Sequence, residues 1–136
     1  MDLVIAIYRL TKEFPRDEQW GLTSQIRRAA VSIPSNIAEG YGRAHRPEYL
    51  HFLSIARGSL MEAETQLQIA VRLEYANRQA AREVWGLLQE VGRLLNKLVK
   101  SLETNRLAED DNAYSLDPFP EPRTLTLRKD NNRSVL

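Results

Sequence analysis

One stretch of the chain, residues 22–42, restricts the possible folds more than any other. Read at 100° per residue, its apolar side chains form one stripe of the kind that faces a hydrophobic core. The stripe consists of Leu22, Ile26, Ala29, Ala30, Ile33 and Ile37. Pro34 lies inside this pattern, where it removes a backbone hydrogen bond and clashes with the carbonyl group of Ala30, at a cost of about 3 kcal/mol. Because the stripe continues in phase beyond Pro34, a single kinked helix is favoured over two helices that break at Ile33.

A polar stripe runs beside the apolar one. Its side chains are mostly short and include no Lys: Gln25, Arg28, Ser32, Ser35, Asn36 and Glu39. A solvated helix face would be rich in Lys and Glu, so we expect these groups to meet other protein. A Glu beside Arg28 is expected to form an ion pair. The third side of the helix carries Arg27, Val31, Pro34 and Ala38.

Three further segments have helical periodicity, so helices are predicted near residues 2–14, 22–41, 47–73 and 78–103. Short connections between long amphipathic segments predict an all-α, antiparallel up-down four-helix bundle. Periodicity ends after Leu102. We therefore expect a bundle domain over residues 1–103 and a disordered or loosely docked tail over 104–136.

Several single residues carry local expectations. Trp20 is expected to pack over the junction of the first two helices, with ligand stacking as the alternative. Gly40 or Gly42 is expected to end a helix in the left-handed conformation. Gly58, inside the third helix, is expected to permit a close approach. Asn77 is predicted to cap the fourth helix.

The third predicted helix presents a second strip beside its core stripe, made of Ile55, Ser59, Glu62, Gln66, Ile69 and Leu73. A monomeric bundle would place solvated charge there. We therefore predict a homo-oligomer whose subunit contacts are made or supported by Arg28, Asn36, Glu39, Ile55, Ile69 and Leu73.

Two groups of basic residues are candidate phosphate contacts. One lies on the far face of the fourth helix and comprises Arg82, Arg93, Lys97 and Lys100; the other lies in the turn before the third helix and comprises Arg43, His45 and Arg46. The alternative for both groups is an ordinary solvated surface.

Composition excludes several classes of function. Residues 1–103 hold 14 Lys and Arg against 12 Asp and Glu, and the remainder holds 5 against 6, so neither part is charged enough to indicate nucleic acid by itself. The absence of Cys removes disulfides, thiolate metal sites and Cys nucleophiles, and fits a cytoplasmic location. We see no secretory signal and no apolar run long enough to cross a bilayer, so no membrane partner is expected.

Catalytic and metal-binding patterns are also missing. Glu48 and His51 have the Glu-x-x-His spacing, but a di-iron site needs two such motifs and two more inward Glu residues. The only other His is His45, in the turn, and no catalytic triad can be assembled. We expect no enzyme activity, no metal and no cofactor.

The run Gln25-Ile-Arg27-Arg28-Ala29-Ala30-Val31-Ser32-Ile33-Pro34-Ser35-Asn36-Ile37-Ala38-Glu39-Gly40 resembles the signature of the four helix bundle protein family, also called the ribosomal RNA intervening-sequence protein family. Matching residues before and after it extend the resemblance over about residues 1–103. Two departures stand out. This chain looks short at its N-terminus by comparison with the family, and it carries Glu74 where members often have Gly.

The resemblance implies a ring-like homopentamer of antiparallel four-helix protomers. It also implies a relation to the accessory proteins of diversity-generating retroelements, which bind nucleic acid and partner a reverse transcriptase. Two functions remain open: an oligomeric protein that binds RNA or DNA through a basic helix face, and a structural or adaptor assembly whose partner is another protein.

Overall fold

The computed structural model describes residues 1–103 and 118–119 of the chain. Within them the chain forms α1 (Asp2–Thr11), a short 3-10 helix η1 (Arg16–Glu18), α2 (Leu22–Tyr41), α3 (Arg46–Arg72) and α4 (Arg78–Leu102). The described residues contain no strand, so the predicted all-α class with four helices is confirmed for this part of the chain.

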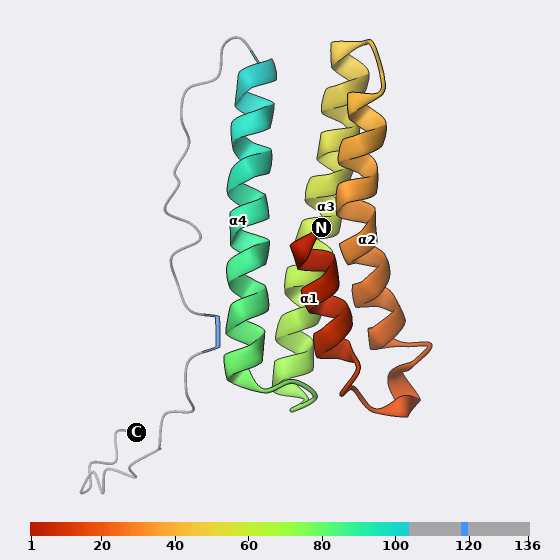
Figure 1. Ribbon diagram of the computed structural model, residues 1–136, viewed down its shortest axis with the longest axis vertical. Helices are drawn as coiled ribbons and strands as arrows, with labels where there is room; N and C mark the ends of the chain where they lie inside the picture. The colour runs from red at the N-terminus through yellow and green to blue at the C-terminus, as the bar shows by residue number, and fades with distance from the viewer. Residues whose placement is uncertain (104–117, 120–136) are drawn as a thin grey trace, which may run out of the picture.

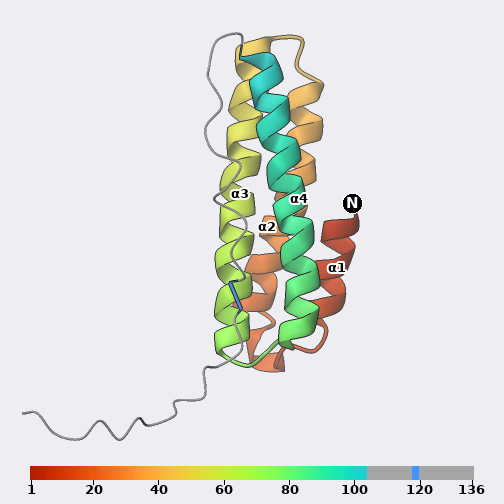
Figure 2. The ribbon, with the colours of Figure 1, turned by 90° about the vertical axis from the view of Figure 1, so that its left-hand side faces the viewer.

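Three long helices and one short helix lie side by side (Figures 1 and 2). In Figure 1 the chain ascends along α2, descends along α3 and ascends again along α4. The 10 residues of α1 extend about 15 Å, against about 30 Å for the 20 residues of α2. As a result, α1 lies between α2 and α4 over the lower part of the view only.

One hydrophobic core holds the four helices together, and the apolar stripes predicted from periodicity supply it. Its largest fully buried side chains are Ile7, Ile26, Ile33, Leu53, Leu60, Leu67 and Leu88. Alanines on α2 and α3 complete the core, including Ala30, Ala56, Ala63 and Ala70, each fully buried. Small side chains let two helix backbones come close, which fits the extensive packing of α2 against α3.

The helix α2 runs without a break through Pro34. The alternative of two helices broken at Ile33 is therefore wrong. Burial of the stripe on both sides of the proline, from Ile26 through Ile33, outweighs the lost hydrogen bond.

The glycines have different roles from those predicted. Gly40 lies inside α2, and no Gly in the described part of the chain has a positive φ, so neither Gly40 nor Gly42 ends the helix in the left-handed conformation. A Cβ atom on Gly40 would lie 2.7 Å from Phe52 Cβ and 2.9 Å from Tyr49 Cδ2, so this glycine permits the close approach of α2 and α3. Gly58, for which that role was expected, faces open space instead.

The ends of the helices follow local chemistry. Asn77 caps α4 as predicted, since its Oδ1 accepts hydrogen bonds from the backbone N–H groups of Gln79 and Ala80. The helix α1 ends at Thr11 rather than near residue 14. Beyond Thr11 the backbone tightens into i→i−3 hydrogen bonds, and Phe14, which precedes Pro15, is buried against the ring of Tyr75 with 5.8 Å between ring centroids.

Most of the predicted tail lies outside the described residues, but Phe119 does not. Its side chain is only 4% exposed, and its ring meets that of Trp85 edge-on, with 5.7 Å between centroids. Packing on the bundle therefore does not end at Leu102. In the described residues, no helix combines the length and the apolar character that a membrane span requires.

Candidate functional site

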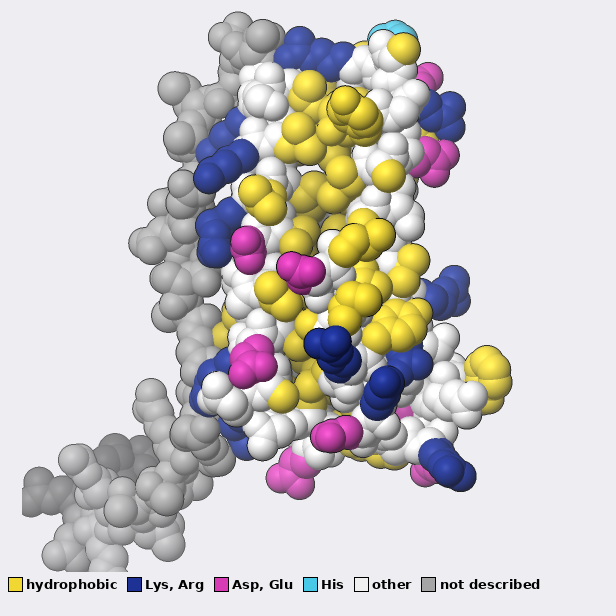
Figure 3. Space-filling model, in the orientation of Figure 1, with side chains coloured by type: hydrophobic (Ala, Val, Ile, Leu, Met, Phe, Trp, Pro, Cys, Tyr) yellow, Lys and Arg dark blue, Asp and Glu magenta, His cyan; other side chains and the backbone are white. Residues whose placement is uncertain are grey.

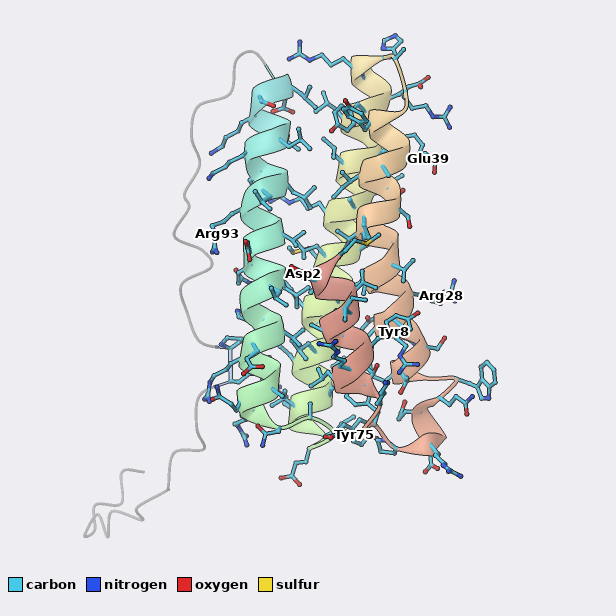
Figure 4. The ribbon with its side chains drawn as sticks, in the orientation of Figure 1. Asp2, Tyr8, Arg28, Glu39, Tyr75 and Arg93 are labelled. Atoms are coloured by element: carbon cyan, nitrogen blue, oxygen red, sulfur yellow. The ribbon has the colours of Figure 1, made fainter. Side chains whose placement is uncertain are left out.

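The basic residues predicted on α4 divide into two environments. Arg93, Lys97 and Lys100 are exposed, and Figure 4 shows Arg93 pointing away from the bundle. Arg82 is half-buried, and its Nη2 donates a 2.7 Å hydrogen bond to the carbonyl oxygen of Phe119. Arg82 thus holds part of the C-terminal segment on α4, a contact that helical periodicity could not indicate.

The turn between α2 and α3 carries the second basic group. Arg43, His45 and Arg46 are all exposed. Arg43 forms an ion pair with Glu39 at 3.2 Å, and its guanidinium lies 5.4 Å from the ring centroid of Phe52. This turn lies at the end of the bundle where α4 finishes (Figure 1). Lys97 and Lys100, in the last turns of α4, are near the same end, whereas Arg93 lies about midway along the helix.

We call the six exposed residues of these two groups the basic surface: Arg43, His45, Arg46, Arg93, Lys97 and Lys100.

The polar stripe of α2 and the second strip of α3 are brought together in the structure. Ser59 Oγ donates a 2.8 Å hydrogen bond to Ser32 Oγ, and Asn36 Nδ2 bonds both the carbonyl and the hydroxyl oxygen of Ser32. The hydrogen bonds of Asn36 are therefore made within its own helix, beside Pro34. The pairing of a Glu with Arg28 is wrong, because Glu39 pairs with Arg43, and Figure 4 places Arg28 and Glu39 at separate levels of α2.

Three aliphatic side chains of the predicted oligomer contact are left exposed by the protomer. The exposed fractions are 39% for Ile55, 42% for Ile69 and 50% for Leu73. Ile55 and Ile69 share one face of α3, Leu73 is its C-cap residue, and Arg28 and Glu39 are also exposed. We call Ile55, Ile69 and Leu73 the α3 strip.

Trp20 occupies a position that the sequence did not predict. It is 87% exposed rather than packed over the helix junction. Glu18 explains this placement, because its backbone carbonyl accepts from Gly21 N and its Oε2 accepts from Leu22 N at 2.8 Å. The link is folded around Glu18, and the indole projects from it.

A surface beside Trp20, formed by α1 and α2, was also missed. Arg27 Nε donates to Thr11 Oγ1 at 2.7 Å, and the guanidinium carbon of Arg27 lies 4.6 Å from the ring centroid of Tyr8. Two features of the sequence could have indicated this surface. Val31 follows Arg27 by one turn on the third side of the central helix, and Ile5 and Tyr8 lie outside the core stripe of the first helix.

Three further features of the structure lie outside these groups. An apolar groove of about 280 Å³ lies between α2 and α4 beyond the start of α1, lined by residues such as Ile37, Leu94 and Leu98. At the contact of α3 and α4, Gln89 Nε2 donates a 3.3 Å hydrogen bond to Glu64 Oε1, and burial raises the pKa of Glu64. In residues 1–103 and 118–119, no group of three or more His, Cys, Asp or Glu side chains could hold a metal ion.

Comparison with known proteins identifies a family and structural relatives. The family model described as "23S rRNA-intervening sequence protein" matches residues 1–97. A crystal structure of a protein of unknown function from the S23 ribosomal protein family of Bacteroides thetaiotaomicron is similar, with a TM-score of 0.68 and 26% sequence identity. The similarity covers 73% of this chain and 93% of that one. No curated protein matches the chain. Since the family model spans most of the described residues, the chain belongs to the 23S rRNA-intervening sequence protein family.

Proposed function

We propose that this chain is a non-enzymatic protein that assembles into a ring-like homopentamer of antiparallel four-helix protomers and binds nucleic acid through its basic surface. The observation that carries the nucleic-acid part is the exposure of Arg93, Lys97 and Lys100 on α4, whose last turns lie at the end of the bundle that also bears Arg43, His45 and Arg46.

The chemistry of the basic surface fits contacts with phosphates rather than with bases. Lys and Arg side chains neutralise backbone phosphates without reading the sequence, and such binding weakens steeply as salt rises. A cyclic assembly repeats the same face once per subunit. Weak phosphate contacts would then combine through a high effective concentration.

Arg82 is outside this proposal. Its guanidinium donates to the carbonyl oxygen of Phe119, so a phosphate would have to replace an existing contact. We therefore assign binding to the six residues of the basic surface.

The second candidate function is a structural or adaptor assembly whose partner is another protein. It is supported by the α3 strip, since Ile55, Ile69 and Leu73 present aliphatic surface outside the core of the protomer. The two candidates predict different outcomes for a nucleic-acid binding experiment.

That experiment measures the affinity of the full chain for single-stranded and duplex RNA and DNA by fluorescence anisotropy across a series of salt concentrations. We expect binding that is independent of nucleotide sequence and that falls as salt rises. The double variant Arg93→Glu, Lys97→Glu should lose binding at least tenfold, because two attractive charges per subunit become repulsive.

A matched control is the double variant Arg9→Glu, Lys12→Glu, which changes the net charge by the same amount at the C-terminal end of α1. It should retain most of the affinity, and light scattering should show that both variants keep the oligomer of the wild type. Failure of the wild type to bind at about 50 mM salt, where phosphate contacts are strong, contradicts the proposal and makes a protein partner the leading function.

A further inference from the structure

The surface formed by α1 and α2 contains two adjoining hollows that share Tyr8 and Val31. The hollow nearer Trp20 has a volume of about 560 Å³, and the hollow beside Ile5 has a volume of about 400 Å³. We call this region the α1–α2 surface. Figure 3 shows hydrophobic side chains across it, with Lys and Arg side chains beside them.

The apolar part of the α1–α2 surface is not an isolated exposed residue. Ile5, Tyr8 and Val31 are 51%, 40% and 40% exposed, and the largely exposed Trp20 stands at one edge. Single exposed apolar residues are normal on soluble proteins, but a contiguous group with a polar rim is typical of an interaction site. Aromatic residues and Arg are also the residues most enriched where binding energy is concentrated.

The charges around the α1–α2 surface are of one sign. Arg9 and Lys12 line one hollow and Arg27 and Arg28 line the other, whereas none of the described residues lining either hollow is Asp or Glu. Arg27 is held in place by Thr11 and by the ring of Tyr8. In the described part of the chain, Arg9, Lys12 and Arg28 take part in no ion pair, so their charges are available to a partner.

We propose that the α1–α2 surface is a docking site for an acidic segment of a partner protein that also carries apolar anchor side chains. The two hollows would receive the apolar anchors, and the carboxylates of the segment would meet Arg9, Lys12, Arg27 and Arg28. This is the pattern of an amphipathic helix in a groove, where anchors recur at i, i+3 or i+4, and i+7. The proposal does not depend on binding of nucleic acid by the basic surface.

A nucleic acid fits this surface less well. Bases stack on aromatic rings, and this surface offers only the indole of Trp20 at its edge and one face of Tyr8, whose other face is covered by the guanidinium of Arg27. The aliphatic side chains of Val4, Ile5 and Val31 offer no ring for stacking. A two-fold contact of this surface with the same surface of a second copy is disfavoured, because it would bring like charges together. A head-to-tail contact would pair it with a different face of the neighbour, and the light-scattering measurement below distinguishes that case.

The test uses the full chain and labelled synthetic peptides designed as probes. The first peptide is an amphipathic helix with Leu anchors at i, i+4 and i+7 and Glu at the intervening surface positions. The second keeps the Leu residues and replaces every Glu with Lys, and the third keeps the Glu residues and replaces every Leu with Ser. Binding is measured by anisotropy of the peptide label.

We expect only the first peptide to bind. The double variant Arg9→Glu, Lys12→Glu should weaken that binding at least tenfold, and Trp20→Ala or Val31→Ser should weaken it several-fold. The double variant Arg93→Glu, Lys97→Glu is the matched control for charge and should leave the affinity unchanged. Circular dichroism should show unchanged helicity in all variants, since the substituted side chains lie outside the core.

Four results overturn the proposal. The first is that the first peptide does not bind, and the second is that the peptide without Leu binds equally well. The third is that oligouridine displaces the first peptide and itself binds the wild type but not the variant Arg9→Glu, Lys12→Glu. The fourth is that light scattering shows dissociation of the oligomer in that variant. The third result makes the surface a nucleic-acid site, and the fourth makes it a contact between copies of the chain.

Discussion

At the scale of single residues, Glu74 has a backbone conformation that suits its side chain poorly. Its φ is 61°, the only positive φ of a non-glycine residue in the described part of the chain. The backbone N–H groups of Tyr75 and Glu74 donate to the carbonyl groups of Ala70 and Val71, at 2.9 and 3.0 Å. These two bonds form the Schellman motif, in which the residue at the position of Glu74 is usually Gly.

We therefore predict that Glu74→Gly stabilises the protein by about 1 kcal/mol, because the left-handed conformation costs an L-residue about 1–2 kcal/mol and costs Gly little. The measurement is urea unfolding at a fixed protomer concentration. Glu74→Ala serves as the control, since it removes the same charge but keeps a Cβ. Equal stability of the two variants would mean that the backbone conformation is not the cause.

A second residue-scale feature is the buried carboxyl group of Glu64. Glu64 is only 8% exposed, and this burial raises the pKa of its carboxyl group, while the hydrogen bond from Gln89 lowers the same pKa. The folded state therefore binds the proton of Glu64 more tightly than the unfolded state does. The stability contributed by this proton is fully present below the unfolded pKa and is lost as pH rises through the raised pKa.

Replacement of Glu64 by Gln should consequently raise stability at neutral pH and flatten the fall in stability above pH about 4.5. The introduced amide could also donate a hydrogen bond to Gln89 Oε1, which has no partner in the described residues. Urea unfolding from pH 5 to pH 8 measures both effects. Glu62→Gln, at an exposed position on the same helix, should change neither; a variant at position 64 that keeps the full pH dependence contradicts the assignment.

At the scale of the helices, the contact of α2 with α3 depends on the absence of a side chain at Gly40. Gly40→Ala should destabilise the protein by about 1–3 kcal/mol, because the new Cβ would overlap Phe52 and Tyr49 and force the helices apart. Gly58→Ala is the matched control: its Cβ meets nothing within 4 Å, so its better helix propensity should stabilise α3 by up to about 1 kcal/mol. Thermal or urea unfolding measures both changes. Destabilisation by both variants to the same extent would contradict the packing argument.

The same contact shows how α2 tolerates Pro34. Its buried side chains Ile26, Ala30 and Ile33 face the core before the proline, and Gly40 is buried after it. A helix held at both ends by its neighbours does not depend on every backbone hydrogen bond. Tertiary packing therefore decides its continuity, and local propensity does not.

At the scale of the whole molecule, the α3 strip predicts self-association. Ile69→Asp should leave the protomer folded, because Ile69 lies outside its core, but should dissociate the oligomer by burying a carboxylate at the subunit contact. Multi-angle light scattering measures the mass, and circular dichroism checks the helicity. Ile5→Asp makes the same chemical change at another exposed position and should keep the oligomer. A wild-type protein that is monomeric at tens of micromolar contradicts the prediction of an oligomer.

Sequence by itself determined the elements with long periodic patterns. Residues spaced by three and four positions predicted α2, α3 and α4 to within one residue at each end, and Asn77 was recognisable as a cap from its position before the fourth pattern. These features depend on neighbours within one turn of helix, and the sequence records those neighbours directly. The same spacing located the α3 strip, whose side chains are exposed in the protomer.

The tertiary structure alone decided the contacts between residues far apart in the chain. Phe14 packs on Tyr75, Gly40 rather than Gly58 lies at a close approach, and Arg82 donates to the carbonyl of Phe119. Trp20 projects from the link folded around Glu18, and Val31 meets Tyr8 only after α1 has packed on α2. Each of these depends on which helices meet and at what level, and a period of 3.6 residues contains no information about either.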